Sequence, residues 1–337
     1  MFTHLNRLGT ACLKASAAVM LTGLMLSPAM AQQQGATTSE LPREQLDLDS
    51  PHQFRYQTVT VFRLNPLGLI NQSQLGYRYR LFNPEDKRPD APLGQRVLQN
   101  TYAGISFAPS MSPAFARPGV LLELQPLALM RFSALYEQQF HYGGFDTIQS
   151  FGSPNAEFSD KDQDDAGAAG LNYSTSGRSL TLAALLQMKV GKIAARSNFR
   201  AQWTDMDTRR NDPVYYDIMF DVLQPAEGWM YTTDSDLLYY ASDTFIVGLR
   251  HTWLTVDYPD DAFLPDENRD LSEKNVPMHR LGPIMVYRFN NVKGTAFNQP
   301  TLFVMANWWL RHRYRTGQEV SQAFPYVLIG YAFNGDL

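Results

Sequence analysis

Two adjoining segments decide the fold: LTLAALLQMKV at 180–190 and KIAARSNFRAQW at 192–203, separated by Gly191. In the first segment, apolar side chains recur at every second position: Leu180, Leu182, Ala184, Leu186, Met188 and Val190. The second segment has an apolar face of Ile193, Ala195, Phe199, Ala201 and Trp203, opposite a polar face of Lys192, Arg196, Asn198, Arg200 and Gln202. A period of two indicates β-strands. The stretch therefore predicts a hairpin of two long strands joined by a tight turn.

The same alternation recurs along most of residues 54–333. It gives thirteen candidate strands, at 54–64, 75–81, 99–108, 119–125, 127–138, 180–190, 192–204, 214–223, 229–240, 245–256, 279–290, 302–313 and 324–333. Many have about 9–12 residues, which exceeds the usual strand of a soluble sheet and suits a tilted strand that crosses a bilayer. We therefore predict an all-β chain that forms an antiparallel transmembrane β-barrel. The side chains expected to face outward are Leu182, Leu186, Phe220, Val304 and Trp308.

The first 31 residues have the pattern of an export signal. Arg7 and Lys14 give a positive start, an apolar run covers 15–26, and Ala29-Met-Ala31 has the small-x-small form that a signal peptidase cuts. The run is too short for a membrane helix, which needs about 20 apolar residues. The only cysteine, Cys12, lies inside this segment. The mature chain is therefore expected to have no disulfides and no thiolate chemistry.

The composition of the mature chain limits its partners. Removal of Arg7 and Lys14 leaves 29 − 2 = 27 basic residues against 33 acidic ones, a net charge of −6. That acidity argues against a nucleic-acid partner, which requires a basic face. Residues 32–50 are polar and aperiodic and are interpreted as a disordered leader. Residues 51–337 are expected to form one barrel domain.

The number of strands can be inferred from the two longest connections. Single-chain bacterial barrels have an even number of strands and long outer loops, so one of the thirteen candidates is expected to be wrong. If the connections 139–178 and 257–278 lie on the same side, an even number of strands separates them, and five candidates do. The weakest alternation is in 229–240, where Asp234 and Asp236 adjoin Thr232 and Thr233. Omitting this segment predicts about twelve strands, within a range of ten to fourteen, with both loops opposite Gly191.

The segment YVLIGYAF at 326–333 resembles the C-terminal strand of bacterial outer-membrane β-barrels, in which alternating apolar residues end in an aromatic. Val327, Ile329, Tyr331 and Phe333 follow that pattern. The departure is the four residues after Phe333, where the family ends on the aromatic. The resemblance implies the architecture and a bacterial outer-membrane location, with contact to outer-membrane lipid, and identifies no individual family.

Charged residues on the polar faces are the candidates for lining the lumen. The basic ones are Arg78, Arg80, Arg131, Arg196, Arg200, Arg288, Arg311 and Arg313, and the acidic ones are Glu123, Asp217 and Asp221. A twelve-strand barrel lies between small filled barrels and open porins. The arginine excess favours a narrow channel for small anionic solutes. The alternative is a non-conducting structural or interaction barrel, in which the arginines pair with carboxylates inside a plugged lumen.

Two acidic stretches, 157–165 and 257–273, are interpreted as solvated outer loops, and loose bridging by surface divalent cations stays open. A calcium loop of the EF-hand type is excluded, because its glycine and glutamate positions are occupied by Asp165 and Leu171. No histidine has the serine or aspartate spacing of outer-membrane phospholipases or proteases, so a hydrolase is the least favoured function. The sequence predicts no catalytic residues, no metal site and no cofactor.

Overall fold

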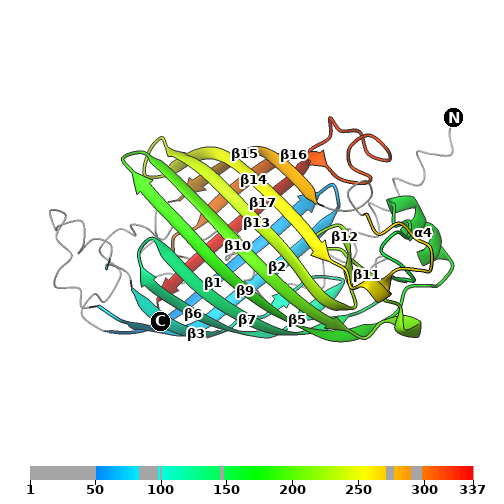
Figure 1. Cartoon of the computed structure of the whole chain (residues 1–337). Helices are drawn as coiled ribbons and strands as arrows, with labels where there is room; N and C mark the ends of the chain where they lie inside the picture. The colour runs from blue at the N-terminus through cyan, green and yellow to red at the C-terminus, as the bar shows by residue number, and fades with distance from the viewer. Residues whose placement is uncertain are drawn as a thin grey trace.

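The computed structural model describes residues 51–82, 98, 101–144, 148–270, 277–289 and 298–336. The signal and leader expected at 1–31 and 32–50 lie outside the described residues. The described chain is built mainly of long tilted strands that wrap into a barrel, seen from the side in Figure 1.

The barrel wall is one antiparallel sheet. Its strands are β1 (His52–Leu64), β2 (Gly68–Arg80), β3 (Tyr102–Phe107), β4 (Ser110–Met111), β5 (Phe115–Arg117), β6 (Gly119–Leu127), β7 (Met130–His141), β9 (Thr175–Val190), β10 (Ile193–Met206), β13 (Glu227–Tyr240), β14 (Phe245–Asp257), β15 (Met278–Arg288), β16 (Thr301–Arg311) and β17 (Tyr326–Asp336). β3 with β4, and β5 with β6, each form one interrupted strand. β1 pairs with both β2 and β17, which closes the sheet. The predicted closed barrel of twelve strands is confirmed.

The hairpin predicted at 180–203 is present as β9 and β10. Ile193 lies opposite Val190 and Trp203 opposite Leu180, so the Gly191 turn sets the register of the pair. Gly191 has a φ of +57°, a left-handed conformation that glycine adopts without strain. Of the side chains expected outside, Leu182, Leu186 and Trp308 are exposed and Val304 is half-buried.

The omitted strand is the wrong one. Residues 229–240 belong to β13, which pairs with β10 and β14 over its full length. Residues 214–223 instead contribute to β11 (Val214–Asp217) and β12 (Val222–Pro225), a short hairpin that pairs only with β8 (Ser150–Phe151). The predicted total of twelve wall strands still holds, because segment 229–240 takes the place of segment 214–223 in the wall. Phe220, expected outside, lies on this hairpin and packs against the buried apolar cluster.

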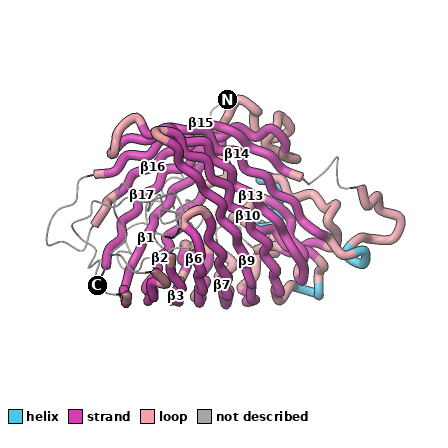
Figure 2. The backbone as a smooth tube through the Cα atoms, turned by 60° about the vertical axis from the view of Figure 1, so that its left-hand side comes forward, coloured by secondary structure: helices cyan, strands magenta, loops and turns pink. Residues whose placement is uncertain are grey.

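The connections differ sharply between the two ends of the barrel. The described residues of the connections 142–174, 207–226, 258–277 and 312–325 lie at one end, which also carries α4 (Asp160–Ala168), η2 (Arg209–Asn211) and η3 (Asp260–Ala262). The turn at Gly191 lies at the other end, together with the first residues of β1 and the last residues of β17 (Figures 1 and 2). The predicted shared side of the two long loops is therefore confirmed. None of the described helices is long and apolar enough to cross a membrane.

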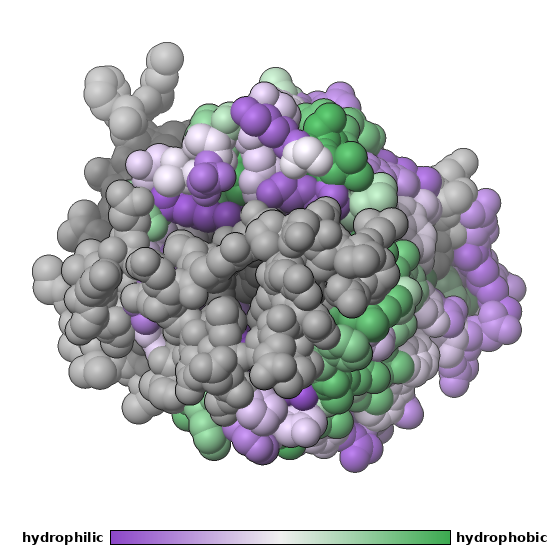
Figure 3. Space-filling model, turned by 90° about the vertical axis from the view of Figure 1, so that its left-hand side faces the viewer, coloured by the Kyte–Doolittle hydropathy of each residue, from purple (hydrophilic) through white to green (hydrophobic). Residues whose placement is uncertain are grey.

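Side chains on the outer face are largely apolar. On β14, for example, Phe245 and Leu249 are 38% and 51% exposed, whereas the alternate residues Ile246 and Arg250 are 0% and 2% exposed. Apolar side chains are visible along the outer wall in Figure 3, which views the barrel from the Gly191 end. A monomeric soluble protein rarely exposes so extended an apolar surface.

Candidate functional site

The lumen is the candidate site, and its first feature is a network of ion pairs across β10, β13 and β14. Asp236 accepts hydrogen bonds from Arg196 and from Nε and Nη2 of Arg250, the latter two at 2.6 and 2.8 Å. Asp234 accepts from Arg200 Nη2 at 2.8 Å. Asp234 and Asp236 are each 4% exposed. Strand alternation places both carboxylates inward, which explains why their segment is a wall strand despite its polar sequence.

A second network lies on β2, β6 and β7. Glu123 is 5% exposed and forms ion pairs with Arg78 at 2.9 Å and with Arg131 at 3.5 Å. Gln74 Nε2 and the Tyr102 hydroxyl lie at 3.4 Å from the same carboxylate. The carboxylate is therefore surrounded by donors from several strands.

Cations also lie over aromatic rings inside the barrel. Lys189 Nζ is 4.1 Å from the centre of the Tyr240 ring, and the Arg288 guanidinium lies 5.9 Å from that ring. The Arg280 guanidinium is 4.1 Å from the Tyr326 ring. Such contacts stabilise a cation without neutralising its charge. They leave a positive wall on β9 and β15.

One sector of the lumen carries closely packed apolar side chains between its charged ones. From β13 through β17 to β1, apolar inward side chains are nearly inaccessible, as with Ile246 at 0%, Phe303 at 1% and Leu328 at 1%. Sequence reasoning missed this sector because it expected polar inner faces throughout. The signal was present in the unbroken apolar runs 302–306 and 327–329, which lack the alternation of a strand with one polar face.

The hairpin of residues 214–225, hereafter the lumen hairpin, fills the loop-rich end of the barrel. Val214, Val222 and Leu223 are each 0% exposed and belong to the same apolar cluster as the inward sector. Arg63 of β1 donates to the carbonyls of Ile218 and Met219, which lie far along the chain. The lumen hairpin is therefore packed inside the barrel.

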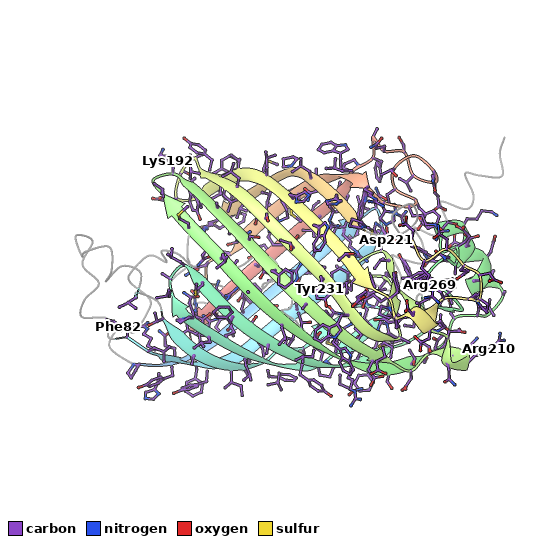
Figure 4. All side chains as sticks on the ribbon, viewed as in Figure 1. Phe82, Lys192, Arg210, Asp221, Tyr231 and Arg269 are labelled. Atoms are coloured by element: carbon purple, nitrogen blue, oxygen red, sulfur yellow. The ribbon has the colours of Figure 1, made fainter. Side chains whose placement is uncertain are left out.

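An ionic latch holds the turn of the lumen hairpin. Arg315 Nε donates to Asp221 at 2.8 Å, and its two Nη atoms donate to Asp160 at the start of α4 at 2.5 and 2.6 Å. His312 Nε2 donates to the Asp221 carbonyl at 3.0 Å. Asp221, labelled in Figure 4, lies inside the loop-rich end. The latch joins three connections that are distant in the sequence.

The other carboxylate of the lumen hairpin, Asp217, has mainly local partners. It accepts from the Met219 backbone N–H at 2.6 Å and from Gln224 Nε2 at 2.9 Å. Arg117 Nη2 of the barrel wall lies farther away, at 3.9 Å. Asp217 thus mainly shapes the hairpin, whereas Asp221 attaches it.

The structure divides the predicted lumen residues. Inward on wall strands lie Arg78, Arg80, Arg131, Arg196, Arg200, Arg288 and Glu123. Asp217 and Asp221 are inside the barrel but on the lumen hairpin, because 214–223 is no wall strand. Arg313 follows β16 and forms an ion pair with Glu157 of a loop. Arg311 lies opposite His279 across a bulge, which turns it to the outer face.

Several inward charges were missed by the sequence reasoning. They are Arg55, Arg63, Arg117, Arg250, Arg280, Glu137, Asp234 and Asp236. The two aspartates were set aside with their segment, although alternation of Thr232, Asp234 and Asp236 with Tyr231 and Leu237 was readable.

The acidic outer stretches are more structured than the solvated loops expected. Residues 160–168 form α4, with a capping box between Ser159 and Asp162. Glu319 accepts from the backbone N–H groups of Asp160 and Lys161 at the start of this helix. Among the described residues no three His, Cys, Asp or Glu side chains are placed to hold a metal ion.

In a closed antiparallel barrel, each wall strand pairs its backbone N–H and C=O groups with two neighbouring strands. This barrel also combines an apolar exterior with a charged lumen. Lipid requires both properties of a spanning β-structure. The chain is an outer-membrane β-barrel. It contacts lipid through its outer face, and the end with the long loops is expected to face the cell exterior.

Comparison with known proteins gives structural resemblances only. No family model matches the chain, and no curated protein matches it. Among solved structures it resembles the NanC porin (8% identity, 84% of this chain, 99% of that one, TM-score 0.34). It also resembles the translocator domain of autotransporter NalP from Neisseria meningitidis (10%, 91% and 94%, 0.36) and the toluene transporter TodX of Pseudomonas putida (9%, 92% and 94%, 0.35). At these scores the resemblances carry no argument about function.

The lipid-facing assignment predicts the effect of a charge at the middle of β14. Leu249→Arg is expected to lower the free energy of unfolding by about 2–4 kcal/mol, the usual effect of arginine at the bilayer midplane. Asp257→Arg, at the end of the same strand, should change it by no more than about 1 kcal/mol. Urea unfolding in phosphatidylcholine vesicles measures both. Equal effects would contradict the depth assignment.

The latch predicts how the lumen hairpin responds to pH. Burial raises the pKa of the Asp221 carboxyl, but the adjacent His312 and Arg315 outweigh burial and hold that pKa well below its usual range. A lowered folded-state pKa stabilises the hairpin above the unfolded value of about 3.9, and this contribution is lost only as the pH falls through the lowered value. Hydrogen-exchange protection of 214–225 is therefore expected to stay constant from pH 8 to pH 5.

Asp221→Asn removes the carboxylate at every pH and leaves Nε of Arg315 and the ring of His312 beside a neutral amide, whereas Asp160 still contacts the two Nη atoms. Loss of one member of a buried ion pair costs about 3–5 kcal/mol, which corresponds to at least about 100-fold faster exchange in 214–225. The control is Asp260→Asn, whose ion pair with Arg269 is exposed. Unchanged exchange in Asp221→Asn would show that the latch does not hold the hairpin.

Proposed function

We propose that the protein is an outer-membrane channel for small anionic solutes, held closed at rest by the lumen hairpin. The observation that supports it is the position of residues 214–225, inside the lumen but outside the wall sheet. Their loop leaves β10 at Met206 and rejoins the wall at Glu227. The hairpin can therefore leave the lumen without unpairing any wall strand.

The attachments of the lumen hairpin suit a gate. The ion pair of Asp221 with Arg315 and the hydrogen bond from Tyr258 to the Leu223 carbonyl connect one loop to another. Such contacts break when outer loops move. The apolar packing of Val222 and Leu223 opposes release, so closure is expected to predominate.

The sign of the wall charge supports anions. Inward basic residues on the described wall strands are Arg55, Arg63, Arg78, Arg80, Arg117, Arg131, Lys189, Arg196, Arg200, Arg250, Arg280 and Arg288. Among the side chains described on these strands, the inward acids are Glu123, Glu137, Asp234 and Asp236. Ion pairing neutralises only part of this basic excess. A fixed positive surface in a narrow, weakly screened space raises the local anion concentration.

The test is the reversal potential of the barrel in a planar bilayer under a potassium chloride gradient. Rare openings of the wild type, and steady current after removal of the lumen hairpin, are expected to reverse on the anion side. Lys189→Gln with Arg288→Gln should reduce that preference, because both cations lie beside Tyr240 on the inner wall. Arg178→Gln on the outer face is the matched control. Cation preference would overturn the electrostatic proposal.

A second candidate is a non-conducting barrel that presents its acidic outer loops to a partner or to divalent cations. The observation that favours it is the continuous apolar cluster that joins the hairpin residues Val214 and Leu223 to wall residues such as Ile284. This packing resembles the hydrophobic core of a soluble protein. If the barrel stays silent even without the lumen hairpin, the second candidate replaces the first. Neither candidate requires enzymatic activity.

A further inference from the structure

Among the described residues of the outer face, a basic cluster lies between apolar neighbours. His251 of β14 and His279 of β15 stack at a ring-centre distance of 5.5 Å, and Nε2 of His251 lies 3.3 Å from Nδ1 of His279. His251 alternates with the inward residues Arg250 and Thr252, which are 2% and 7% exposed, so it faces outward. Two polar rings on the lipid side of a barrel require an explanation.

Arg311 completes the cluster. The register of β15 and β16 shifts beside His279, so that Arg280 lies opposite Trp309 and His279 opposite Arg311. Trp309 is 3% exposed and contacts the inward Arg280 guanidinium. Residues directly opposite in an antiparallel pair share a face, so Arg311 lies outside with His279. The bulge thus re-aims a charged side chain, a common use of bulges.

The position along the barrel axis is interfacial. His279 is the second residue of β15 and Arg311 the last of β16, both at the loop-rich end. Trp253 lies opposite His279, and Trp308 lies opposite Leu281, slightly further from that end. Tryptophan on the outer face marks the boundary between lipid tails and headgroups. The cluster therefore lies at the level of the headgroups of the outer leaflet.

The chemistry of the cluster favours an anion. A guanidinium and two imidazoles offer N–H donors, and the outer-face residues opposite the two histidines in the β14–β15 register, Trp253 and Leu281, are apolar. The 3.3 Å separation of the two imidazole nitrogens would also suit a zinc pair, but the Arg311 charge beside them opposes a cation. Arginine and histidine at a headgroup boundary complement a phosphate.

We propose that His251, His279 and Arg311 bind the phosphate of a lipid headgroup in the outer leaflet. The two tryptophans would lie along the upper part of the lipid, and the three basic side chains would contact its phosphate. This site is on the outer face and does not depend on whether the lumen conducts.

The test uses the full mature barrel in detergent, titrated with short-chain phosphatidic acid and followed by native mass spectrometry. A retained lipid is expected for the wild type and for Arg178→Gln, a control that removes an outer-face arginine elsewhere. His279→Gln with Arg311→Gln should weaken retention at least tenfold. Conductance of the same samples should not change. Equal retention by wild type and double variant would overturn the proposal.

Two further arms separate the alternatives. The lipid should raise the midpoint of thermal unfolding, and inorganic phosphate at the same concentration should not. If inorganic phosphate raises it equally, the site binds free anions instead. Zinc chloride should give no stabilisation. Stabilisation by zinc that is lost in His251→Gln and kept in Arg311→Gln would overturn the proposal in favour of a metal site. A folded state for each variant is checked by heat-modifiable mobility on gels.

Discussion

Replacement of residues 214–225 by a short Gly-Ser linker is expected to convert a mostly silent barrel into one that conducts steadily. The segment contributes fully buried apolar side chains, among them Val214, Val222 and Leu223, and occupies the lumen at the loop-rich end. A barrel of twelve strands lies between those filled by side chains and those with open channels. We expect the mean current in a planar bilayer to rise by about tenfold or more, since a hydrated path replaces a packed one.

The control keeps the loop length and alters another connection. Replacement of residues 160–168, which form α4, leaves the hairpin inside the barrel but removes the Asp160 contact to Arg315. This variant should show more frequent openings and no steady current. A hairpin-free barrel that stays silent while folded would mean that the apolar sector alone closes the lumen.

Loss of the Asp236 carboxylate is expected to produce the largest change in stability. Asp236→Leu leaves the buried guanidiniums of Arg196 and Arg250 without their carboxylate, since both donate to it. Breaking such a buried pair typically costs about 3–5 kcal/mol, because the remaining charge is uncompensated. Urea unfolding in phosphatidylcholine vesicles measures this change, whereas most lumen substitutions alter selectivity more than stability.

A matched exposed pair provides the comparison. Arg178 and Asp205 form an ion pair at 2.7 Å with side chains 54% and 34% exposed, so Asp205→Leu should change the unfolding free energy by no more than about 1 kcal/mol. Adding Arg250→Leu to Asp236→Leu should recover part of the lost stability. Similar effects of Asp205→Leu and Asp236→Leu would show that water screens the inner network.

The sequence predicts the wall well where one face is apolar and the other polar. Residues 180–203 form the predicted hairpin because a shift of one position would expose Arg196 and Arg200 to lipid. The sequence pattern misleads where apolar side chains are buried by other parts of the protein and not by lipid. Residues 214–223 alternate in sequence like a wall strand, yet Tyr216 and its neighbours Tyr215 and Asp217 are all buried inside the lumen. A period of two in the sequence cannot distinguish a face buried in lipid from one buried in protein.

The candidate site was predictable in part for a similar reason. Alternation identifies Arg78, Arg131 and Arg200 as inward, and the structure places each beside a carboxylate. Alternation cannot identify the carboxylate partner, since Asp234 reaches Arg200 from the neighbouring strand. The bulge at His279 also has no sequence signal, and it moves Arg311 from the inner to the outer face.

The pairing of β1 with β17 affects how the barrel forms. Arg55 lies opposite Asp336 and Leu64 opposite Val327, so the residues that join the sheet into a ring are separated by most of the chain. Contacts of such long sequence separation form slowly, because the intervening chain must first be ordered. Until they form, β1 and β17 expose unpaired backbone edges that can recruit other strands. Ring closure is therefore the step at which this chain is most exposed to misassembly, and the step at which help from other proteins would matter most.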